Sequence, residues 1–192
     1  MMHLYPHGRV PNNHPQVIQF CVEANGWIRG VEVGLGRGQN MSHLMSTCPH
    51  LHMIGVDVFR HMPEAPGEEA YRAMNHEGNR KRLRTLEKAF SERFRVLEMT
   101  SREASFRVEE ESADFVFIDA DHSTEGCLED IGLWAPKVKI GGWILGHDYN
   151  RFGINEAVNK AFGGFPDVDY QVLPYSVWAK RKEVSDVVRT YA

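Results

Sequence analysis

The sequence predicts an α/β fold in which a mostly parallel, doubly wound sheet ends in a C-terminal antiparallel strand pair. Short apolar runs alternate with segments whose apolar residues lie three or four positions apart, as expected where strands alternate with helices. A glycine-rich stretch follows the first such run. The chain has 192 residues, enough for one sizeable core but few for two domains of ordinary size. We therefore expect residues 1–192 to form a single domain.

The chain order of these elements begins with a helix. Pro15 occupies a favourable first helical position, and Val17, Ile18 and Cys21 follow at helical spacing, so we expect a helix over 14–24. The other expected helices cover 39–46, 80–90, 124–134 and 155–162. The expected parallel strands cover 30–33, 52–56, 94–98, 115–119 and 143–146.

Two parts of the chain depart from this alternation. Apolar runs over 170–173 and 177–180 lie close together around Pro174, which is typical of an antiparallel strand pair. Residues 58–79 form the one long irregular stretch, with charged residues flanking a PEAPG segment. Loops of this length often cover a functional site, so we expect a lid there.

The composition limits the kinds of partner. A formal net charge of −4 gives no general attraction to nucleic acid, and no apolar run is long enough to span a membrane. The N-terminus lacks the apolar centre of a secretory signal, so we expect a cytoplasmic protein. Cys21, Cys48 and Cys127 form no CxxC pair, which favours reduced packing residues over disulfides or zinc ligands. A small-molecule partner is favoured.

The stretch VEVGLGRGQN places Gly34, Gly36 and Gly38 directly behind an apolar strand. Glycines there let the backbone approach a ligand, because side chains would occupy the ligand's space. The dinucleotide fingerprint is G-x-G-x-x-G, whereas the third glycine here comes one position too early for it. Glu32 precedes the loop, and a carboxylate attracts an ammonium group but repels a pyrophosphate. Spacing and charge therefore favour an aminoacyl nucleoside over NAD.

Further nucleoside contacts are expected after the next two strands. The second strand ends in IGVDVF, which places Asp57 and Val58 where an acid can accept hydrogen bonds from both ribose hydroxyls. Thr100 and Ser101 follow the third strand and can offer a backbone N–H and a hydroxyl to an adenine edge. The structural alternative is that the glycines only form a turn and that these polar residues cap helices.

Two later strands end in acids and histidines. IDADHS places Asp119, Asp121 and His122 after the fourth strand, and GHDY places His147 and Asp148 after the fifth. In an open parallel sheet the ligand crevice lies beyond the carboxyl ends of the strands, so these side chains should meet there. Carboxylates that close need a proton or a cation between them. We therefore expect either a divalent metal or a protonated acid.

These motifs resemble a known family. The pattern E-x-G-x-G-x-G that begins at Glu32 resembles the first motif of class I S-adenosylmethionine-dependent methyltransferases. The later segments resemble metal-dependent O-methyltransferases of the catechol type, and more closely small uncharacterised methyltransferases that carry IDADHS and GG-x-x-x-G-HDY. The resemblance covers about residues 28–150. It implies a Rossmann-like class I methyltransferase fold with S-adenosylmethionine as cofactor, bound in part by Asp119.

The same resemblance implies a metal site. In the catechol group the first Asp of D-A-D and the Asp of a D-N pair hold magnesium, and a Lys after D-A-D is the base. The matching metal ligands are Asp119 and Asp148, whereas His122 stands in place of the Lys and Tyr149 in place of the Asn. Oxygen ligands suit Mg²⁺, and His147 as a third ligand favours another divalent ion such as Mn²⁺, Fe²⁺ or Zn²⁺.

Methyl transfer from a sulfonium depends on alignment and on removal of the acceptor's proton. His122 is the first choice for that base and His147 the second, with Asp119 completing the expected catalytic set. No N/D-P-P-Y/F stretch follows the fourth strand, so we expect O-methylation of a small-molecule or sugar hydroxyl rather than of a base amine. The alternatives are a nucleotide- or metal-dependent oxidoreductase or hydroxylase, and a non-catalytic S-adenosylmethionine-binding module. A homodimer is expected by analogy.

Overall fold

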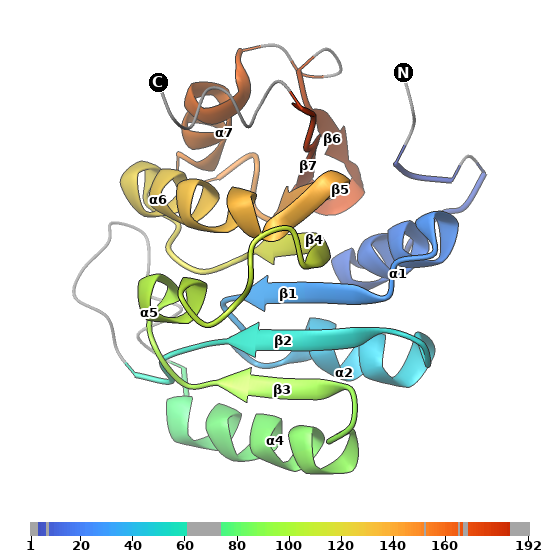
Figure 1. Ribbon diagram of the computed structural model, residues 1–192, viewed down its shortest axis with the longest axis vertical. Coiled ribbons are helices and arrows are strands. Elements are labelled where there is room, and N and C mark those ends of the chain that lie inside the picture. The colour runs from blue at the N-terminus through green and yellow to red at the C-terminus, as the bar shows by residue number, and fades with distance from the viewer. Residues whose placement is uncertain are drawn as a thin grey trace.

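The computed structural model describes residues 4–6, 8–60, 74–151, 153–164, 166 and 169–184. The strands are β1 (Arg29–Val33), β2 (His52–Val56), β3 (Phe94–Leu97), β4 (Ala113–Ile118), β5 (Val138–Gly146), β6 (Gln171–Leu173) and β7 (Val177–Arg181). The α-helices are α1 (His14–Asn25), α2 (Gln39–Thr47), α4 (His76–Ala89), α5 (Ser101–Ser105), α6 (Thr124–Trp134) and α7 (Ile154–Phe162). The strands form one sheet of order β3-β2-β1-β4-β5-β7-β6 (Figure 1).

The pairing of the strands confirms the predicted fold class. β1 is parallel to β2 and β4, and the parallel part continues to β3 on one side and β5 on the other. β7 is antiparallel to both β5 and β6. The strand order reverses its direction between β1 and β4, and in sheets of this kind the ligand crevice lies at that point, beyond the carboxyl ends of the strands.

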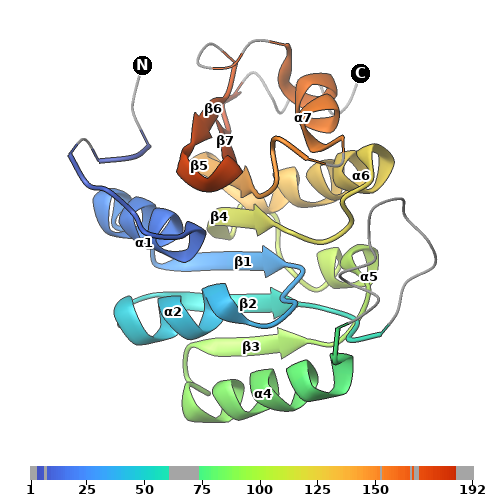
Figure 2. The ribbon, with the colours of Figure 1, turned by 180° about the vertical axis from the view of Figure 1, so that it is seen from behind.

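Helices cover both faces of the sheet, as the two opposite views show (Figures 1 and 2). On one face, Ile18 of α1, Met41 of α2 and Leu83 of α4 belong to a single buried hydrophobic cluster. On the other face, Ala104 of α5 and Ile131 of α6 belong to a second cluster, to which α7 also contributes. The apolar spacing in the sequence therefore marks the buried side of the predicted helices correctly.

Some element boundaries differ from the predicted ones. β5 begins at Val138 rather than 143, because the strand continues through a glycine pair in which Gly141 has a φ of 83°. α4 begins at His76, so the last part of the expected lid over 58–79 is helical. Residues 61–73 of that stretch lie outside the described part of the chain, and the lid stays a prediction.

The short helix α5 is missing from the predicted elements. Thr100 Oγ1 accepts a hydrogen bond from the Glu103 backbone N–H at 3.2 Å, and the Glu103 carboxylate accepts one from the Thr100 backbone N–H at 3.0 Å. This reciprocal pair is a capping box, and its T-x-x-E pattern is a sequence signal for the start of a helix. The signal was present, but a five-residue helix has too few apolar positions to show periodicity.

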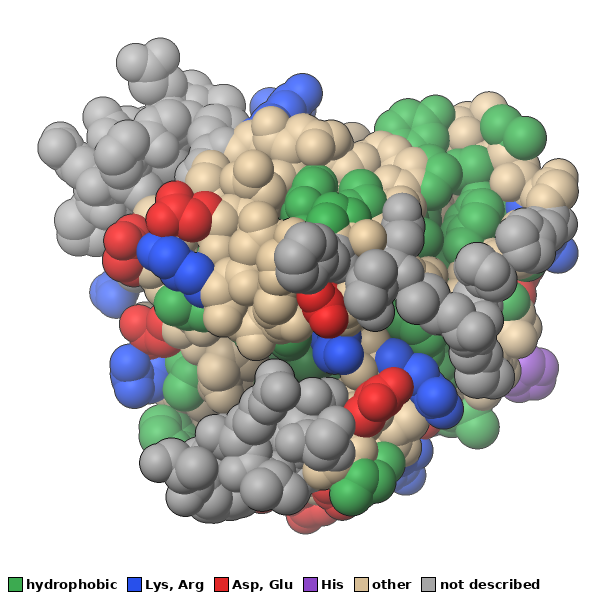
Figure 3. Space-filling model, turned by 90° about the horizontal axis from the view of Figure 1, so that it is seen from above, with side chains coloured by type: hydrophobic (Ala, Val, Ile, Leu, Met, Phe, Trp, Pro, Cys, Tyr) green, Lys and Arg blue, Asp and Glu red, His purple; other side chains and the backbone are tan. Residues whose placement is uncertain are grey.

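The three cysteines are free and buried, as predicted for packing residues. Among the described residues, the model contains no helix with the length and apolar character needed to cross a membrane. On the face seen in Figure 3, acidic and basic side chains are interspersed with hydrophobic ones.

Candidate active site

The glycine loop leaves β1 with a backbone that only glycine adopts easily. Gly34, Gly36 and Gly38 have φ values of 88°, 48° and 71°. A Cβ atom at Gly34 would lie 2.1 Å from the carbonyl oxygen of Asp119, so this glycine lets the β1 and β4 ends approach each other. Among the described residues, the nearest atom to a Cβ at Gly36 would be that of the Met74 side chain, at 3.9 Å. Gly36 therefore borders open space.

Asp57 fixes the shape of this loop from the end of β2. Its Oδ2 atom accepts hydrogen bonds from the backbone N–H groups of Leu35 at 2.9 Å and Gly36 at 3.0 Å. Its Oδ1 atom accepts one from the backbone N–H of Phe59 at 2.7 Å. After these bonds Oδ1 keeps one lone-pair site, whereas both sites of Oδ2 are used. Asp57 can thus hold the loop and still accept a bond from a ligand.

Glu32 is a buried acid with an unused oxygen. Its Oε1 accepts a hydrogen bond from Asn40 Nδ2 at 2.7 Å, whereas its buried Oε2 has no hydrogen-bond partner among the described residues. Burial raises the pKa of Glu32 well above its ordinary value, and the nearby Asp119 and Asp57 charges raise it further. An unpaired buried carboxyl is costly, so this site fits a cationic group of a ligand.

A cavity of about 920 Å³ joins these groups to the carboxyl ends of the other strands. Apart from Gly38, every residue predicted to bind the cofactor or metal or to act in catalysis lines this cavity. Gly38 instead precedes α2, where a Cβ atom would lie 2.8 Å from the Leu83 side chain. The topology has brought predicted site residues from the ends of five strands, β1 to β5, into one space.

Thr100 and Ser101 line the cavity, but their hydroxyl protons are committed elsewhere. The Thr100 hydroxyl donates to Glu103 Oε2 at 2.7 Å. The Ser101 hydroxyl donates to Asp130 Oδ1 and accepts from Trp134 Nε1 at 2.8 Å. Neither hydroxyl is a free donor for an adenine, so the predicted hydroxyl contact requires a rearrangement.

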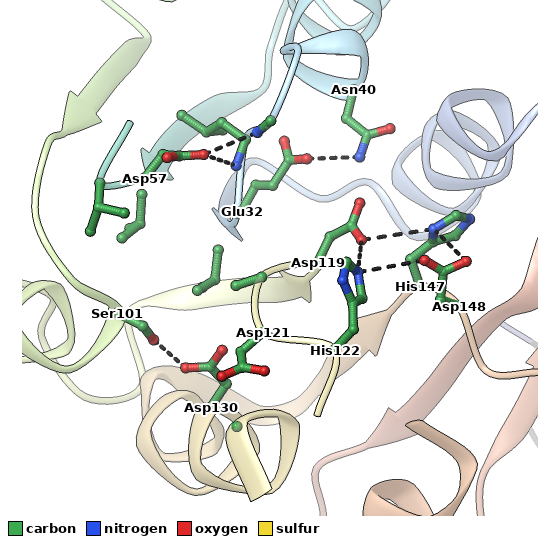
Figure 4. Close-up of a pocket in the computed structure, with 18 of the residues that line it drawn as sticks. Glu32, Asn40, Asp57, Ser101, Asp119, Asp121, His122, Asp130, His147 and Asp148 are labelled. Atoms are coloured by element: carbon green, nitrogen blue, oxygen red, sulfur yellow. Dashed lines mark hydrogen bonds and ion pairs between the residues drawn. The ribbon is translucent and has the colours of Figure 1, made fainter. Parts of the chain in front are cut away.

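The acids and histidines after β4 and β5 form one cluster (Figure 4). His122 Nε2 lies 3.4 Å from Asp119 Oδ1 and 3.5 Å from Asp148 Oδ2. His147 Nδ1 lies 3.8 Å from Asp119 Oδ1 and 3.5 Å from Asp148 Oδ1. Asp148 has a φ of 53°, an uncommon conformation for a residue other than glycine and one often seen at functional sites. The two histidines thus bracket the two carboxylates.

The charges in this cluster shift its pKa values. Burial lowers the pKa of His147, but Asp148 and Asp119 outweigh it, so the net shift is upward. The hydrogen bond with His147 lowers the pKa of Asp148.

His14 of α1, which was not among the predicted site residues, also lines the cavity, and its ring lies 4.5 Å from the His147 ring. Burial lowers the pKa of His14, and His147 adds to that shift. No sequence motif marks His14.

The ligand atoms of Asp119, His122 and Asp148 all lie within 4.8 Å of one another, which is close enough to hold a metal ion. His147 lies beside both carboxylates but outside that set. The Tyr149 hydroxyl instead forms a hydrogen bond with the Tyr170 hydroxyl at 2.6 Å, on the side of β6. The position that holds the metal-binding Asn in the catechol group is therefore turned into the protein interior. Two carboxylates and one or two imidazoles are the donors available to an ion.

The fold and the site define a class. A parallel sheet with a glycine loop after β1, an acid after β2 and a cavity at the strand ends is the arrangement of class I S-adenosylmethionine-dependent methyltransferases. A family model described as a methyltransferase domain matches residues 31–149. The chain belongs to this family and is an S-adenosylmethionine-dependent methyltransferase. A search of the curated proteins gives no match.

Three solved structures with this fold illustrate the likeness, all at low sequence identity. A candidate caffeoyl-CoA O-methyltransferase from Staphylococcus aureus is 17% identical, with 90% of this chain and 86% of that chain covered and a TM-score of 0.59. A cofactor-bound protein from Mycobacterium tuberculosis is 17% identical, with coverages of 93% and 84% and a TM-score of 0.61. An S-adenosylhomocysteine-bound methyltransferase from Podospora anserina is 15% identical, with coverages of 88% and 77% and a TM-score of 0.60. These likenesses establish the fold.

Proposed function

We propose that the protein methylates a hydroxyl of a small-molecule or sugar acceptor, with His122 as the general base. The observation that carries this proposal is the cavity itself. The glycine loop and Asp57 line it, and so do His122, Asp119 and Asp148. A nucleoside cofactor and an acceptor can therefore lie in a continuous space. Structural neighbours named as O-methyltransferases support an oxygen acceptor.

The residues of the glycine loop fit S-adenosylmethionine. The unpaired Oε2 of Glu32 suits the ammonium group of the methionine moiety, and Asp57 Oδ1 keeps one lone-pair site for a ribose hydroxyl. Gly36 leaves room that a side chain would fill. When bound, the cofactor supplies a methyl group already activated by the positive sulfonium. The protein's own part is then to align the acceptor and to remove its proton.

The neighbours of His122 support its role as the base. Its Nε2 faces two carboxylates, Asp119 and Asp148, at 3.4 and 3.5 Å. Once the imidazole has taken a proton, the two negative charges stabilise the resulting cation. His147 is the second choice, because its Nδ1 faces the same carboxylates and its ring packs beside that of His14. A neutral imidazole is required in either case before the proton can move.

A divalent metal fits the same cluster. Asp119 and Asp148 supply carboxylate oxygens, and His122 or His147 supplies an imidazole nitrogen. Oxygen donors alone suit Mg²⁺, whereas an added imidazole shifts the preference toward ions such as Mn²⁺ or Zn²⁺. An ion held there supplies Lewis acidity, which makes a hydroxyl easier to deprotonate. If His122 is a ligand, His147 becomes the base.

The test measures S-adenosylhomocysteine formation over a panel of phenolic and sugar hydroxyl acceptors, at pH 6–9 and with Mg²⁺, Mn²⁺ or EDTA. His122→Ala should lower kcat by about 10²- to 10⁴-fold, as loss of a general base does, and leave the affinity for S-adenosylhomocysteine unchanged. His147→Ala identifies the second choice, and the exposed His52→Ala is the matched control.

The outcomes separate the open possibilities. Turnover that survives His122→Ala across the whole pH range shows that His122 is not the base. Cofactor binding without product from any acceptor supports a non-catalytic binding module instead. Activity that EDTA leaves unchanged argues against a metal. If EDTA abolishes the activity, the added ion that restores it is identified as the metal.

A further inference from the structure

A second cavity lies at the other end of the sheet, where the parallel strands begin. Its volume is about 590 Å³, which is within the usual size of a small-molecule site. The first residues of β1, β2 and β3 line it, together with residues 107–109, which follow α5. Among the described residues, no side chain lines both cavities. The proposed methyl transfer therefore makes no use of this space.

The second cavity exists because α5 is too short to cover the sheet. A helix of five residues is about 7–8 Å long, whereas a strand of five residues such as β1 spans about 16 Å. Figures 1 and 2 show α5 at the arrowhead ends of β1, β2 and β3. On the face that α5 covers, the first residues of these strands are left open.

Two arginines belong to this open face. Side chains two positions apart on a strand lie on the same face of the sheet. Arg29 and Arg95 lie two positions before Val31 and Leu97, which share a hydrophobic cluster with α5. One strand separates β1 from β3, so the two arginines belong to strands about 10 Å apart. Arg107, from the segment after α5, also lines the cavity.

The guanidinium groups of these three arginines are uncommitted. They are exposed, and within the described part of the chain none of them forms a hydrogen bond or an ion pair. Arg93 also lines the cavity but differs, because it donates to the carbonyl oxygens of Cys48 at 3.0 Å and Leu51 at 3.2 Å. Glu92 and Glu109 line the cavity without pairing with an arginine. The free guanidinium donors are therefore available to an anion.

We propose that this cavity binds a small ligand that carries a di- or triphosphate group. Guanidinium is planar and can bind phosphate through two parallel hydrogen bonds, which lysine cannot do. A chain of phosphates carries several negative charges and can engage arginines from more than one strand. Ile54 and Val108 add apolar surface against which the rest of such a ligand can pack. The site lies apart from the methyl-transfer cavity, so the inference does not rest on the proposed function.

The experiment measures binding of inorganic tripolyphosphate by calorimetry, with and without S-adenosylhomocysteine. The wild-type protein should bind tripolyphosphate saturably and with the same affinity in both conditions. Arg29→Gln, Arg95→Gln and Arg107→Gln should each weaken this binding by about tenfold or more, as expected when hydrogen bonds between charged groups are lost. The affinity for S-adenosylhomocysteine should stay unchanged in all three variants, which also shows that they fold.

Arg9→Gln is the matched control, because it makes the same change of charge at an arginine that pairs with Glu23 of α1. This variant should keep the wild-type affinity for tripolyphosphate. Absence of saturable binding to the wild-type protein, or an unchanged affinity in the Arg29 and Arg95 variants, overturns the inference. Competition with S-adenosylhomocysteine would place the anion in the other cavity, and equally tight binding of citrate would mean selection for charge alone. Either result also overturns it.

Discussion

Asp57 illustrates how one side chain can serve both the fold and a ligand. Its position at a strand end predicts a ribose contact. The structure adds three backbone hydrogen bonds, from Leu35 and Gly36 of the glycine loop and from Phe59 after β2. Glu32 is different, because Asn40 satisfies only one of its oxygens. The sequence identified both acids but could not show which lone pairs the protein itself uses.

At the same scale, Asp130 should make stability depend on pH. Burial and the Asp121 charge raise its pKa from 3.8 to about 7 in the folded state. The folded protein therefore binds this proton more tightly than the unfolded chain, and the resulting stability is lost as pH rises from about 4 to about 7. The full shift corresponds to about 4 kcal/mol at most, at about 1.4 kcal/mol per pKa unit. Urea denaturation at several pH values measures this loss.

Asp130→Asn is the variant that isolates this effect. An amide does not titrate, so the slope of unfolding free energy against pH between about 4 and 7 should become less negative than in the wild-type protein. Glu125→Gln serves as the control, since Glu125 is an exposed carboxyl on the same helix. Identical slopes in the wild-type protein and the Asp130 variant would show that this carboxyl is ionised in the folded state across the range.

At the scale of elements, the glycine loop needs its glycines for two different reasons. One glycine packs closely against the backbone of the protein, and another leaves space for a ligand. Gly34→Ala places a Cβ atom 2.1 Å from a backbone oxygen at a φ of 88°, and should destabilise the protein by about 3 kcal/mol or more. Gly36→Ala meets no atom of the described residues nearer than 3.9 Å, so it should cost only about 1–2 kcal/mol from its positive φ.

The two variants should therefore fail in different ways. Thermal denaturation should show a large loss of stability for Gly34→Ala and a small one for Gly36→Ala. Calorimetry should show that the folded Gly36 variant binds S-adenosylhomocysteine more than tenfold more weakly, because its methyl group enters the cavity. Wild-type affinity in that variant would mean that no ligand approaches this part of the loop.

The edge strand β3 is protected by the helix before it. Glu87 of α4 accepts a hydrogen bond from the Val96 backbone N–H at 2.7 Å and pairs with Arg84 at 2.7 Å. Arg84 also donates to the Val96 carbonyl at 3.4 Å. These side chains occupy the backbone groups through which an edge strand would otherwise pair with another chain.

Glu87→Ala should thus lower the free energy of unfolding by about 1–2 kcal/mol, since it leaves the Val96 N–H without its protein partner. It should also increase aggregation on concentration, because the edge of β3 becomes open. Urea denaturation and light scattering measure the two effects. Lys88→Ala, at the next position in α4, is the control, and an equal response from both variants would contradict the edge-capping role.

At the scale of the whole molecule, one sheet carries the entire site. Hydrophobic clusters cover both of its faces, and the cavity draws side chains from the ends of β1, β2, β4 and β5. The predicted single domain should unfold in one cooperative transition. Because S-adenosylhomocysteine should bind only the folded state, a concentration of 100 times its dissociation constant should add about 2.7 kcal/mol of stability.

Scanning calorimetry with and without this ligand tests both expectations, with NAD as the negative control. A single peak that S-adenosylhomocysteine moves to higher temperature, and that NAD leaves in place, is the expected result. Two separated peaks would contradict the single domain. A shift with NAD alone would support a dinucleotide cofactor, which the glycine spacing disfavours.

The sequence by itself determined the fold class, the order of the elements and the strand ends that carry Glu32, Asp57, Asp119 and Asp148. Such features are local, because periodicity, glycine spacing and polar residues after apolar runs are read within short windows. The sequence also favoured a nucleoside with an aminoacyl group over a dinucleotide. Its misses were the short helix α5 and the early start of β5, where capping and glycines outweigh periodicity.

Only the tertiary structure decided which side chains meet. Ser101 contacts Asp130 across 29 positions of sequence, and His14 of α1 lies beside His147, which follows β5. It also showed that Tyr149 turns away from the acids and that Gly38 lies outside the cavity. Contacts of this kind depend on strand order and helix packing, which bring distant segments together, so no pattern within a short window contains them.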